Sequence, residues 1–559
     1  MRTAALSALS LLLAGCHCTG AARDAGGAGS DAAPGGDAGA SSADAAATDA
    51  GPPPPPPSEI CARPVDLADV SAPTTVVGDG TPALCTESAL AAAVAAGGVV
   101  TFDCGAAPVT ITVSAEIVVA ADTILDGGGL VTLDGGGATR IMAIHATFDV
   151  AGPYLTVQRL AFANGRASGT ATPLGTDLDG GGGAIFHEGG TVTAIDCTFT
   201  ANHAADTGPD VGGGAIYGLG VGATTAVGCT FSANTGSNGG AIGVLFNSLT
   251  IVNSTLDANV ATGFGANYVD PGTGMQAGSG GNGGAVAMDG QGATLTICGS
   301  SFTNNRGGAI GGAVFRTSYE SEPTDIDRST FDGNAIEDHL NEPGETSLCG
   351  GLYLQGTSVT ITDSTISDNI ATGTGGLWVN EHGAAPGSLD MTNVTVANNA
   401  VYEHPALGDT GLAGGIWVGD GVTGTLLNCT IAGNFAQFGA GITGIEPLVL
   451  LNTIVANTSS NLYVPINCTN LPPGAGAPAS GMGNLQWPMT NLAGDDFLCA
   501  TGVTFGDPLL GALADNGGPT RTLLPAAGSP AIGLGSACPP ADQRGNPRGE
   551  PCAAGAVEP

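Results

Sequence analysis

A recurring Gly-Gly pair constrains the fold of this chain more than any other feature of the sequence. In the clearest copy, Gly213-Gly214-Ala215-Ile216 is followed about 20 residues later by Phe231 and Asn234. An apolar residue three positions before an asparagine is the common partner of each pair. The pairs begin at Gly182, Gly213, Gly239, Gly283, Gly311, Gly350, Gly375 and Gly414, and a weaker copy, Ala440-Gly441, closes the series. The asparagines are Asn202, Asn234, Asn259, Asn305, Asn334, Asn369, Asn399, Asn434 and Asn457, with Asn164 as an earlier, degenerate member.

A repeat of this length predicts an all-β solenoid of short parallel strands, with three strands in each coil. One coil cannot bury its apolar face alone, but stacked coils bury it together and place equivalent residues about 4.8 Å apart. The apolar position therefore becomes an internal ladder. We expect the Gly-Gly pair to turn the backbone with positive φ. We expect the asparagines to form a structural ladder of turn residues, whose amides bond the backbone or the next asparagine.

The insertions between repeats indicate where a binding face would lie. Most extra residues fall between an asparagine and the next Gly-Gly pair, so stacked coils would project them along one edge. These insertions are residues 204–211, 261–282, 335–349 and 400–413, and a second set, residues 316–324 and 381–387, lies elsewhere in the coil.

The rest of the chain divides into four further parts. Residues 1–16 read as a lipoprotein signal peptide, since a short apolar run ends in Leu13-Ala14-Gly15-Cys16, which resembles the bacterial lipobox with Cys16 as the lipidated residue. An ordinary secretory signal is the alternative. Residues 17–59 form an Ala/Gly/Asp/Pro tether that we expect to be disordered. Residues 60–120 contain an N-terminal cap, with a helix at Thr86–Ala96, and the first coils. The repeats occupy residues 121–457, and a C-terminal region follows at residues 458–559.

The repeats resemble the right-handed parallel β-helix of pectin-lyase-like proteins and, more narrowly, the repeats of polymorphic outer-membrane proteins. The C-terminal region resembles the choice-of-anchor Q domain at Asp515 to Thr520, Gly528 to Ile532, Asp542 to Gly545 and Gly555 to Glu558. It departs from that domain at Gly533 to Gly535, where an Asp is usual. The resemblance implies a surface-exposed bacterial protein with no defined activity.

Fourteen cysteines are typical of an exported protein in an oxidising compartment. We expect three disulfides between cysteines that are close in sequence and outside the main stack, namely Cys85–Cys104, Cys468–Cys499 and Cys538–Cys552. Cys197 and Cys229 share one repeat position and either pair or stay as buried thiols. The pairing of Cys18, Cys61, Cys298, Cys349 and Cys429 is left open.

The charge balance excludes several classes of partner. The chain has 49 acidic residues against 12 basic ones, all of them Arg, so nucleic acid is not an expected partner. No catalytic or metal-binding residues are assigned. Calcium is the one cofactor considered, on Asp177, Asp179, Asp206 and Asp210 in two Gly-rich loops, and solvated loop residues are the alternative. The acidic stretch Glu320 to Glu345 is interpreted in the same way, as charged loops at the rim.

Together these features predict a monomeric, non-enzymatic protein of the cell envelope, at the outer membrane or cell surface. Lipid would attach it to the membrane. It would act in adhesion, in recognition or as an envelope scaffold, with an extracellular glycan or protein as its partner. The alternative is a carbohydrate-active β-helix enzyme, a polysaccharide lyase or glycoside hydrolase. Such hydrolases need two or three nearby carboxylates, and the repeats show no such constellation in sequence.

Overall fold

The computed structural model describes residues 59–270, 272, 274–337, 347–402, 411, 413–457, 464–491 and 493–559. The signal peptide, Cys16, Cys18 and nearly all of the tether lie outside the described residues. So do Asp338, His339, Glu342 and Glu345 of the acidic stretch.

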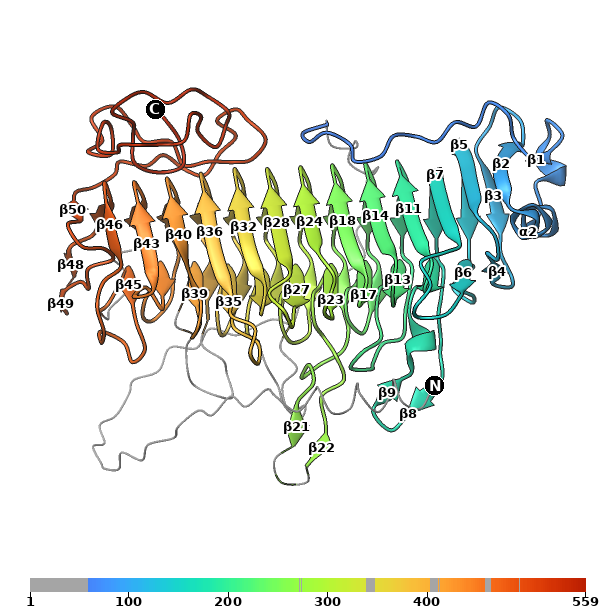
Figure 1. Cartoon of the computed structure of the whole chain (residues 1–559), viewed down its shortest axis with the longest axis horizontal. Coiled ribbons are helices and arrows are strands. Elements are labelled where there is room, and N and C mark those ends of the chain that lie inside the picture. Colours follow the sequence, from blue (N-terminus) through green and yellow to red (C-terminus); the bar gives the residue numbers. More distant parts are fainter. Residues whose placement is uncertain are drawn as a thin grey trace, which may run out of the picture. The chain divides into compact units, whose positions relative to one another are not determined.

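The chain folds as a right-handed parallel β-helix, as the repeat predicts (Figure 1). One coil, Ile216 to Gly236, holds four short strands instead of the expected three: β13 (Ile216–Leu219), β14 (Ala223–Val227), β15 (Thr230–Ser232) and β16 (Thr235–Gly236). The strands of each coil pair in register with those of the next, so the coils stack into three parallel sheets that we call A, B and C.

Sheet A has 26 strands, two in most coils. Its strands are β1 (Thr75–Gly78), β2 (Gly98–Asp103), β3 (Val109–Thr112), β5 (Thr123–Asp134), β7 (Tyr154–Ala163), β11 (Thr191–Ile195), β12 (Thr198–Thr200), β14, β15, β18 (Ser248–Val252), β19 (Thr255–Asp257), β24 (Leu295–Cys298), β25 (Ser301–Thr303), β28 (Pro323–Asp327), β29 (Thr330–Asp332), β32 (Ser358–Thr362), β33 (Thr365–Ser367), β36 (Ser388–Thr392), β37 (Thr395–Ala397), β40 (Thr423–Leu427), β41 (Thr430–Ala432), β43 (Leu448–Leu451), β44 (Ile454–Ala456), β46 (Ser480–Met482), β47 (Leu485–Trp487) and β50 (Thr504–Phe505).

Sheets B and C complete the coil. The strands of sheet B are β4 (Ile117–Val118), β6 (Met142–His145), β10 (Ile185–Glu188), β13, β17 (Ile242–Leu245), β23 (Val286–Asp289), β27 (Val314–Thr317), β31 (Leu352–Gln355), β35 (Leu377–Asn380), β39 (Ile416–Val418), β42 (Ile442–Thr443) and β45 (Cys468–Thr469). Those of sheet C are β16, β20 (Val260–Ala261), β26 (Arg306–Gly307), β30 (Ala335–Ile336), β34 (Ile370–Ala371) and β38 (Ala400–Val401). Three antiparallel hairpins lie outside these sheets: β8 (Ala171–Thr172) with β9 (Gly175–Thr176), β21 (Val269–Asp270) with β22 (Met275–Gln276), and β48 (Thr490–Asn491) with β49 (Gly494–Asp495).

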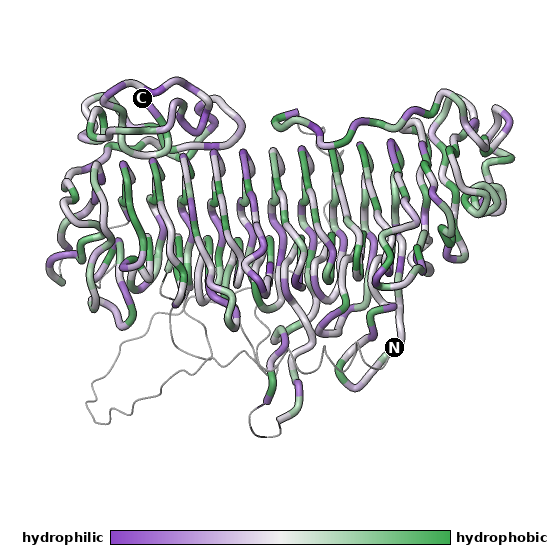
Figure 2. Tube along the Cα trace, in the orientation of Figure 1, coloured by the Kyte–Doolittle hydropathy of each residue, from purple (hydrophilic) through white to green (hydrophobic). Residues whose placement is uncertain are grey.

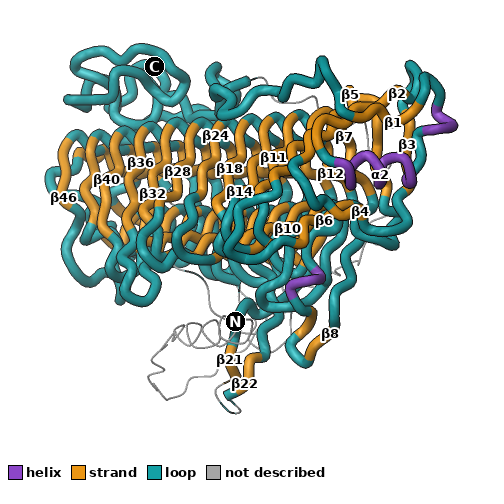
Figure 3. Tube along the Cα trace, turned by 45° about the vertical axis from the view of Figure 1, so that its right-hand side comes forward, coloured by secondary structure: helices purple, strands orange, loops and turns teal. Residues whose placement is uncertain are grey.

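A helix covers the open end of the stack, as the sequence predicts (Figure 3). It is α2 (Glu87–Ala96), and the Thr86 hydroxyl caps it by accepting a hydrogen bond from the Ala89 amide at 3.3 Å. Leu90 and Val94 are fully buried against the first coils, so the helix shields apolar surface that a terminal coil would otherwise expose. Two short 3-10 turns, Pro82–Leu84 and Leu178–Gly180, lie outside the sheets.

One expected turn is part of a strand. The sequence suggests that Asp126 to Gly129 leaves the sheet, but β5 runs through it from Thr123 to Asp134. The register against β7 shifts between Asp126 and Val131, so the glycines form an irregularity inside the strand and not a turn between strands.

The interior is a set of apolar ladders. Phe162, Phe199 and Phe231 stack with ring centroids 4.9 and 4.7 Å apart, and all three side chains are fully buried. Apolar residues (green in Figure 2) recur in coil after coil. Because each ring lies on the ring of the next coil, the core is continuous along the stack.

The asparagines form a hydrogen-bonded row beside this core. Asn305, for example, accepts hydrogen bonds from the Asn259 amide and side chain at 3.0 Å each, and donates to Leu256 and to Asn334. All nine predicted asparagines join the row, and Asn467 extends it. At all of the nine predicted asparagines except Asn457, the residue before has positive φ, as Asn304 does before Asn305. Asn164 has that left-handed position itself, and Gly165 occupies the ladder position.

One glycine of each pair is required by close stacking. A Cβ on Gly214 would collide with the carbonyl of Gly240, and one on Gly284 with that of Gly312. In the first five pairs, the second glycine is the closely packed one and the first glycine has positive φ. In the last three pairs, the alignment with the preceding strand of sheet B is shifted by one residue. Gly350, Gly375 and Gly414 therefore occupy the close-packed position, preceded by Cys349, Thr374 and Ala413 without positive φ. The positive φ expected of every pair is wrong for these three.

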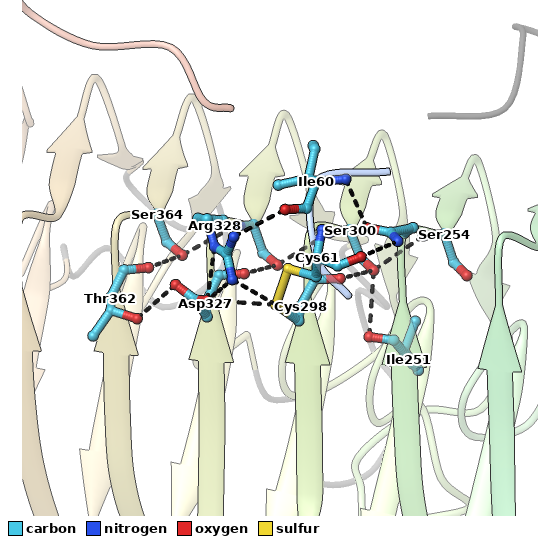
Figure 4. The surroundings of a disulfide bond; sticks show 12 residues. Ile60, Cys61, Ile251, Ser254, Cys298, Ser300, Asp327, Arg328, Thr362 and Ser364 are labelled. Carbon is cyan, nitrogen blue, oxygen red and sulfur yellow. Dashed lines mark hydrogen bonds and ion pairs between the residues drawn. A yellow bond between two sulfur atoms is a disulfide. The ribbon is translucent and has the colours of Figure 1, made fainter. Parts of the chain in front are cut away.

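Residues 59–72, which we call the N-terminal strap, run back along the outside of sheet A (Figures 1 and 4). The strap is fixed at one end by the disulfide Cys61–Cys298, which joins cysteines 237 residues apart. Asn253 accepts the Cys61 amide at 2.9 Å and donates to its carbonyl at 2.8 Å. Further along, Arg63 forms an ion pair with Asp196 at 2.8 Å. The strap thus fastens several coils to one another.

The C-terminal region covers the following coils on the same side (Figure 1). The parallel stack itself extends past residue 457, where the repeat was expected to end, because β44 pairs with β47 and β47 with β50. Residues 506–559 contain no strand or helix and fold back over sheet A. Gln543 accepts a hydrogen bond from Thr395 at 2.6 Å, Asn428 donates to the Ala553 carbonyl at 3.1 Å, and Arg521 forms an ion pair with Asp332.

Candidate functional site

The outer face of sheet B carries a row of aromatic side chains. In each strand the first residue, such as Ile216, points into the core and the second points outward, because side chains alternate along a strand. The register aligns the outward positions from strand to strand. They are occupied in order by Phe186, Tyr217, Gly243, Ala287, Phe315, Tyr353, Trp378 and Trp417. We call the six aromatic members the aromatic row.

The rings of the row lie close to one another. Phe315 and Tyr353 have centroids 5.9 Å apart, and Trp378 and Trp417 stack at 4.4 Å with an interplanar angle of 10°. Phe315 and both tryptophans are partly exposed. The Trp378 indole N–H is buried and has no hydrogen-bond partner within the described part of the chain. The row therefore offers ring surface at Phe315, Trp378 and Trp417.

A pocket interrupts the row at Gly243 and Ala287. Tyr217 bounds it on one side and Phe315 on the other. These two residues are three coil steps apart, about 14 Å at the spacing of parallel strands, so the small residues Gly243 and Ala287 leave a recess between the two rings. Two inserted loops form the remaining wall, at residues 209–212 and at Asn267 and Asn282.

Hydrogen bonds hold the two loops together. The Asn238 amide donates to the carbonyls of Gly208, Pro209 and Val211 at 2.9–3.0 Å, which fixes the loop that carries Asp210. The Ser237 hydroxyl contacts the carbonyls of Gly208 and Ser279 at 2.7 and 2.8 Å, one from each loop. Both loops are therefore set by side chains of the stack that lie directly before β17.

Three acceptors in this pocket are unused. The buried Oδ1 atoms of Asn267, Asn282 and Asp289 have no hydrogen-bond partner among the described residues. Asn282 is only 4% exposed, so only a group that enters the pocket can reach its Oδ1. An unpaired buried polar atom costs about 1–3 kcal/mol, which makes three at one place a strong indication of a missing donor.

The pocket has an unusual charge environment. Burial raises the pKa of Asp289 to about 6, and neighbouring Asp210 acts in the same direction. Burial also raises the pKa of Asp210. Arg316 lies inside the coil beneath Asp289 and is fully buried, and burial lowers its pKa to about 10. The Tyr319 hydroxyl hydrogen-bonds Asp289 and stabilises its charged form.

Of the four acidic residues considered for calcium, only Asp210 lies in the pocket. Asp179 accepts hydrogen bonds from Thr170 instead, and Asp206 is exposed. In the described residues no three carboxylates of this group approach one another, and the single cluster of three potential ligands, Cys61, Cys298 and Asp327, contains a disulfide.

The acidic stretch after Glu320 is also dispersed. The Glu322 carboxylate accepts hydrogen bonds from the Ser318 hydroxyl and from the backbone amides of Gly292 and Glu320. Asp332 pairs with Arg521 of the C-terminal region. The part of this stretch that the structure describes is held by separate contacts and does not form one site.

Two of the predicted insertions, residues 204–211 and the described part of 261–282, lie at the expected edge. They emerge next to sheet B, and β8, β9, β21 and β22 extend from the same side of the stack (Figure 1). Most of the insertions at 335–349 and 400–413 lies outside the described residues. The aromatic row and the acceptors Asn267, Asn282 and Asp289 were not predicted from the sequence. The row had a signal, because an aromatic residue follows the first apolar residue after most Gly-Gly pairs, and two of the three tryptophans fall there.

The structure joins the three expected cysteine pairs, Cys85–Cys104, Cys468–Cys499 and Cys538–Cys552, and adds Cys61–Cys298. Cys197, Cys229, Cys349 and Cys429 are buried thiols, and burial raises the pKa of Cys349 and Cys429 to about 12. The disulfides indicate an extracytoplasmic protein, because such bonds persist in oxidising compartments. None of the helices in the described residues is long and apolar enough to cross a membrane.

Comparison with known proteins gives the class of the fold and no further identity. No family model matches the chain, and no curated protein matches it. Solved structures with a similar architecture include the alginate lyase AlyF-OU02 in complex with G6, at 12% identity over 79% of this chain and 88% of that chain, with a TM-score of 0.41. The periplasmic alginate epimerase AlgG matches at 9% identity over 71% of this chain and 77% of that chain, with a TM-score of 0.34. The Streptococcus pneumoniae surface adhesin PfbA matches at 10% identity over 79% of this chain and 96% of that chain, with a TM-score of 0.26. These likenesses are too distant to bear on function.

Proposed function

We propose that this protein binds a carbohydrate chain along the outer face of sheet B. The aromatic row with its central pocket carries the proposal. Ligand sites are lined by apolar and aromatic groups with a few placed polar atoms, and a sugar ring offers one apolar face and a rim of hydroxyls. The coil step of about 4.8 Å is close to the length of one sugar unit in an extended chain.

The test uses the two stacked tryptophans. Trp378→Ala combined with Trp417→Ala should weaken glycan binding by the full chain at least tenfold, because it removes the exposed ring surface of the row. Isothermal titration against a panel of neutral, acidic and amino-bearing oligosaccharides measures the affinity. The matched control is Trp487→Ala, which removes a 40% exposed tryptophan on sheet A. Equal binding by the double variant and the wild type would refute the proposal, as would a panel in which nothing binds.

A carbohydrate-active enzyme is the second candidate. The observation that favours it is the meeting of Asp210 and Asp289 in one pocket, where the raised pKa of Asp289 suits a proton donor near neutral pH. Product formation in the same oligosaccharide panel distinguishes the two functions. Binding without turnover supports recognition, whereas turnover that disappears in Asp289→Asn supports hydrolysis.

We further propose that lipid on Cys16 attaches the chain to the outer membrane or cell surface and that the C-terminal region is a choice-of-anchor Q domain. The lipobox-like residues and the C-terminal motifs support these assignments. Cys16→Ala should release the protein from the membrane fraction, as followed by immunoblot after cell fractionation. Unchanged membrane association would contradict lipidation.

A further inference from the structure

We propose that the pocket between Tyr217 and Phe315 binds a sugar unit that carries a free ammonium group, so that the glycan is an amino-bearing one. This inference rests on the proposed function and names the substrate class of the same site. It follows from what the pocket offers and from what it lacks.

The pocket contains three buried acceptor atoms that have no partner among the described residues. The free Oδ1 atoms of Asn267, Asn282 and Asp289 all require a donor, and Asp210 adds a second carboxylate. The Asn238 amide and the Tyr217 hydroxyl are potential donors, but they are engaged with backbone carbonyls of the loop at 208–211. An ammonium group is a compact source of three donors, and it matches this set.

The charge balance favours a cation. Asp210 and Asp289 are carboxyl groups of the pocket, and Arg316 is the guanidinium whose charge acts on Asp289. Glu322 also acts on Arg316, so the carboxyl groups outnumber the one guanidinium and the surroundings attract a positively charged group. A calcium ion prefers six to eight oxygens and usually several carboxylates, so a pocket with a buried guanidinium beside one of its two carboxylates suits it less well.

The walls of the pocket point to the same chemistry. Tyr217 and Phe315 flank the floor, and a cation is attracted to the face of an aromatic ring. The formal net charge of −37 would also draw a polycationic chain toward the protein at low ionic strength. The adjacent rings of the aromatic row would then hold the neighbouring sugar units.

The experiment compares two oligosaccharides that differ only at nitrogen. The full chain is titrated with the hexamer of glucosamine and with the hexamer of N-acetylglucosamine at pH 6.5, where a large share of the glucosamine amines is protonated while Asp289, with a pKa of about 6, is mostly ionised. We expect the amino form to bind at least tenfold more tightly, and we expect Asp289→Asn to abolish this preference. Asp325→Asn, an exposed carboxylate on sheet A, is the matched control and should retain it.

The outcomes separate this inference from the proposed function. If both hexamers bind equally, or if Asp289→Asn keeps the preference, the ammonium site is refuted while glycan binding stands. If neither hexamer binds, and no glycan in the wider panel binds, both proposals fail. Calcium chloride is titrated alone as a further arm. Calcium binding that Asp289→Asn abolishes and that competes with the glucosamine hexamer would show a metal site and overturn the proposal.

Discussion

Single buried carboxyls set how this protein responds to pH. Asp363 lies in the turn between β32 and β33, under the C-terminal region, where its Oδ1 accepts a hydrogen bond from Asn393 at 3.0 Å. Its backbone carbonyl accepts one from Thr520 at 3.2 Å. Burial raises the pKa of Asp363 to about 6, and the charges of Asp327 and Asp542 contribute to the rise. The folded protein therefore holds this proton more tightly than the unfolded chain does.

This raised pKa makes a prediction about stability. Ionised Asp363 destabilises the fold above pH 6, and the penalty fades as the pH falls from about 6 toward 4, since the side chain is then protonated in both states. Asp363→Asn should thus stabilise the protein at pH 8 by about 1 kcal/mol, allowing for partial exposure, and have no effect near pH 4. Urea denaturation at both pH values measures the difference. An equal effect at both would show that lost packing, and not charge, is responsible.

At the scale of elements, the regular parts of the coil were predictable and the irregular parts were not. The helix at Thr86–Ala96 and the stacked apolar positions follow from local signals that recur or are strong in themselves, such as a hydroxyl cap before an Ala-rich run. Close approach in the stack leaves no room for a side chain at Gly214 or Gly284, so the glycine spacing reports the coil period directly.

The candidate site arises where that period is broken. Asn282 precedes a Gly-Gly pair and Asp289 is the last residue of β23 in sheet B, and neither position is distinctive in sequence. Their proximity to Asp210 depends on how two inserted loops of different length fold against each other through Ser237 and Asn238. Nothing in the repeat specifies that fold. The gap in the aromatic row, in contrast, was visible as small residues at Gly243 and Ala287 in an otherwise aromatic position.

At the scale of the molecule, the disulfide Cys61–Cys298 was beyond sequence reasoning. Its cysteines are 237 residues apart, and their meeting depends on the strap running back along the stack for several coils. Only the position of each coil in three dimensions shows which cysteine the strap reaches.

This long-range disulfide should stabilise the protein more than a short-range one. In the chain-entropy account, a cross-link that closes a longer loop restricts the unfolded chain more. The double variant Cys61→Ser with Cys298→Ser should therefore lower the free energy of unfolding by about 5 kcal/mol. The double variant Cys538→Ser with Cys552→Ser removes a disulfide whose cysteines are only 14 residues apart. It should lower the free energy of unfolding by about 3 kcal/mol. Thermal and urea denaturation of the two double variants compare them. A larger loss from the shorter closure would show that native contacts outweigh chain entropy here.

The same disulfide also determines how the protein bears force. Tension applied to the residues before Glu59 would reach the fold in the middle of the stack, because Ile60 is hydrogen-bonded to Asn253 and Arg328 and the next residue, Cys61, is covalently joined to Cys298. The coils before Cys298 then carry no tension from that end, so the force does not unfold them one after another. The tension would act on the strands next to β24 together. The strands that carry the aromatic row would therefore keep their register under load.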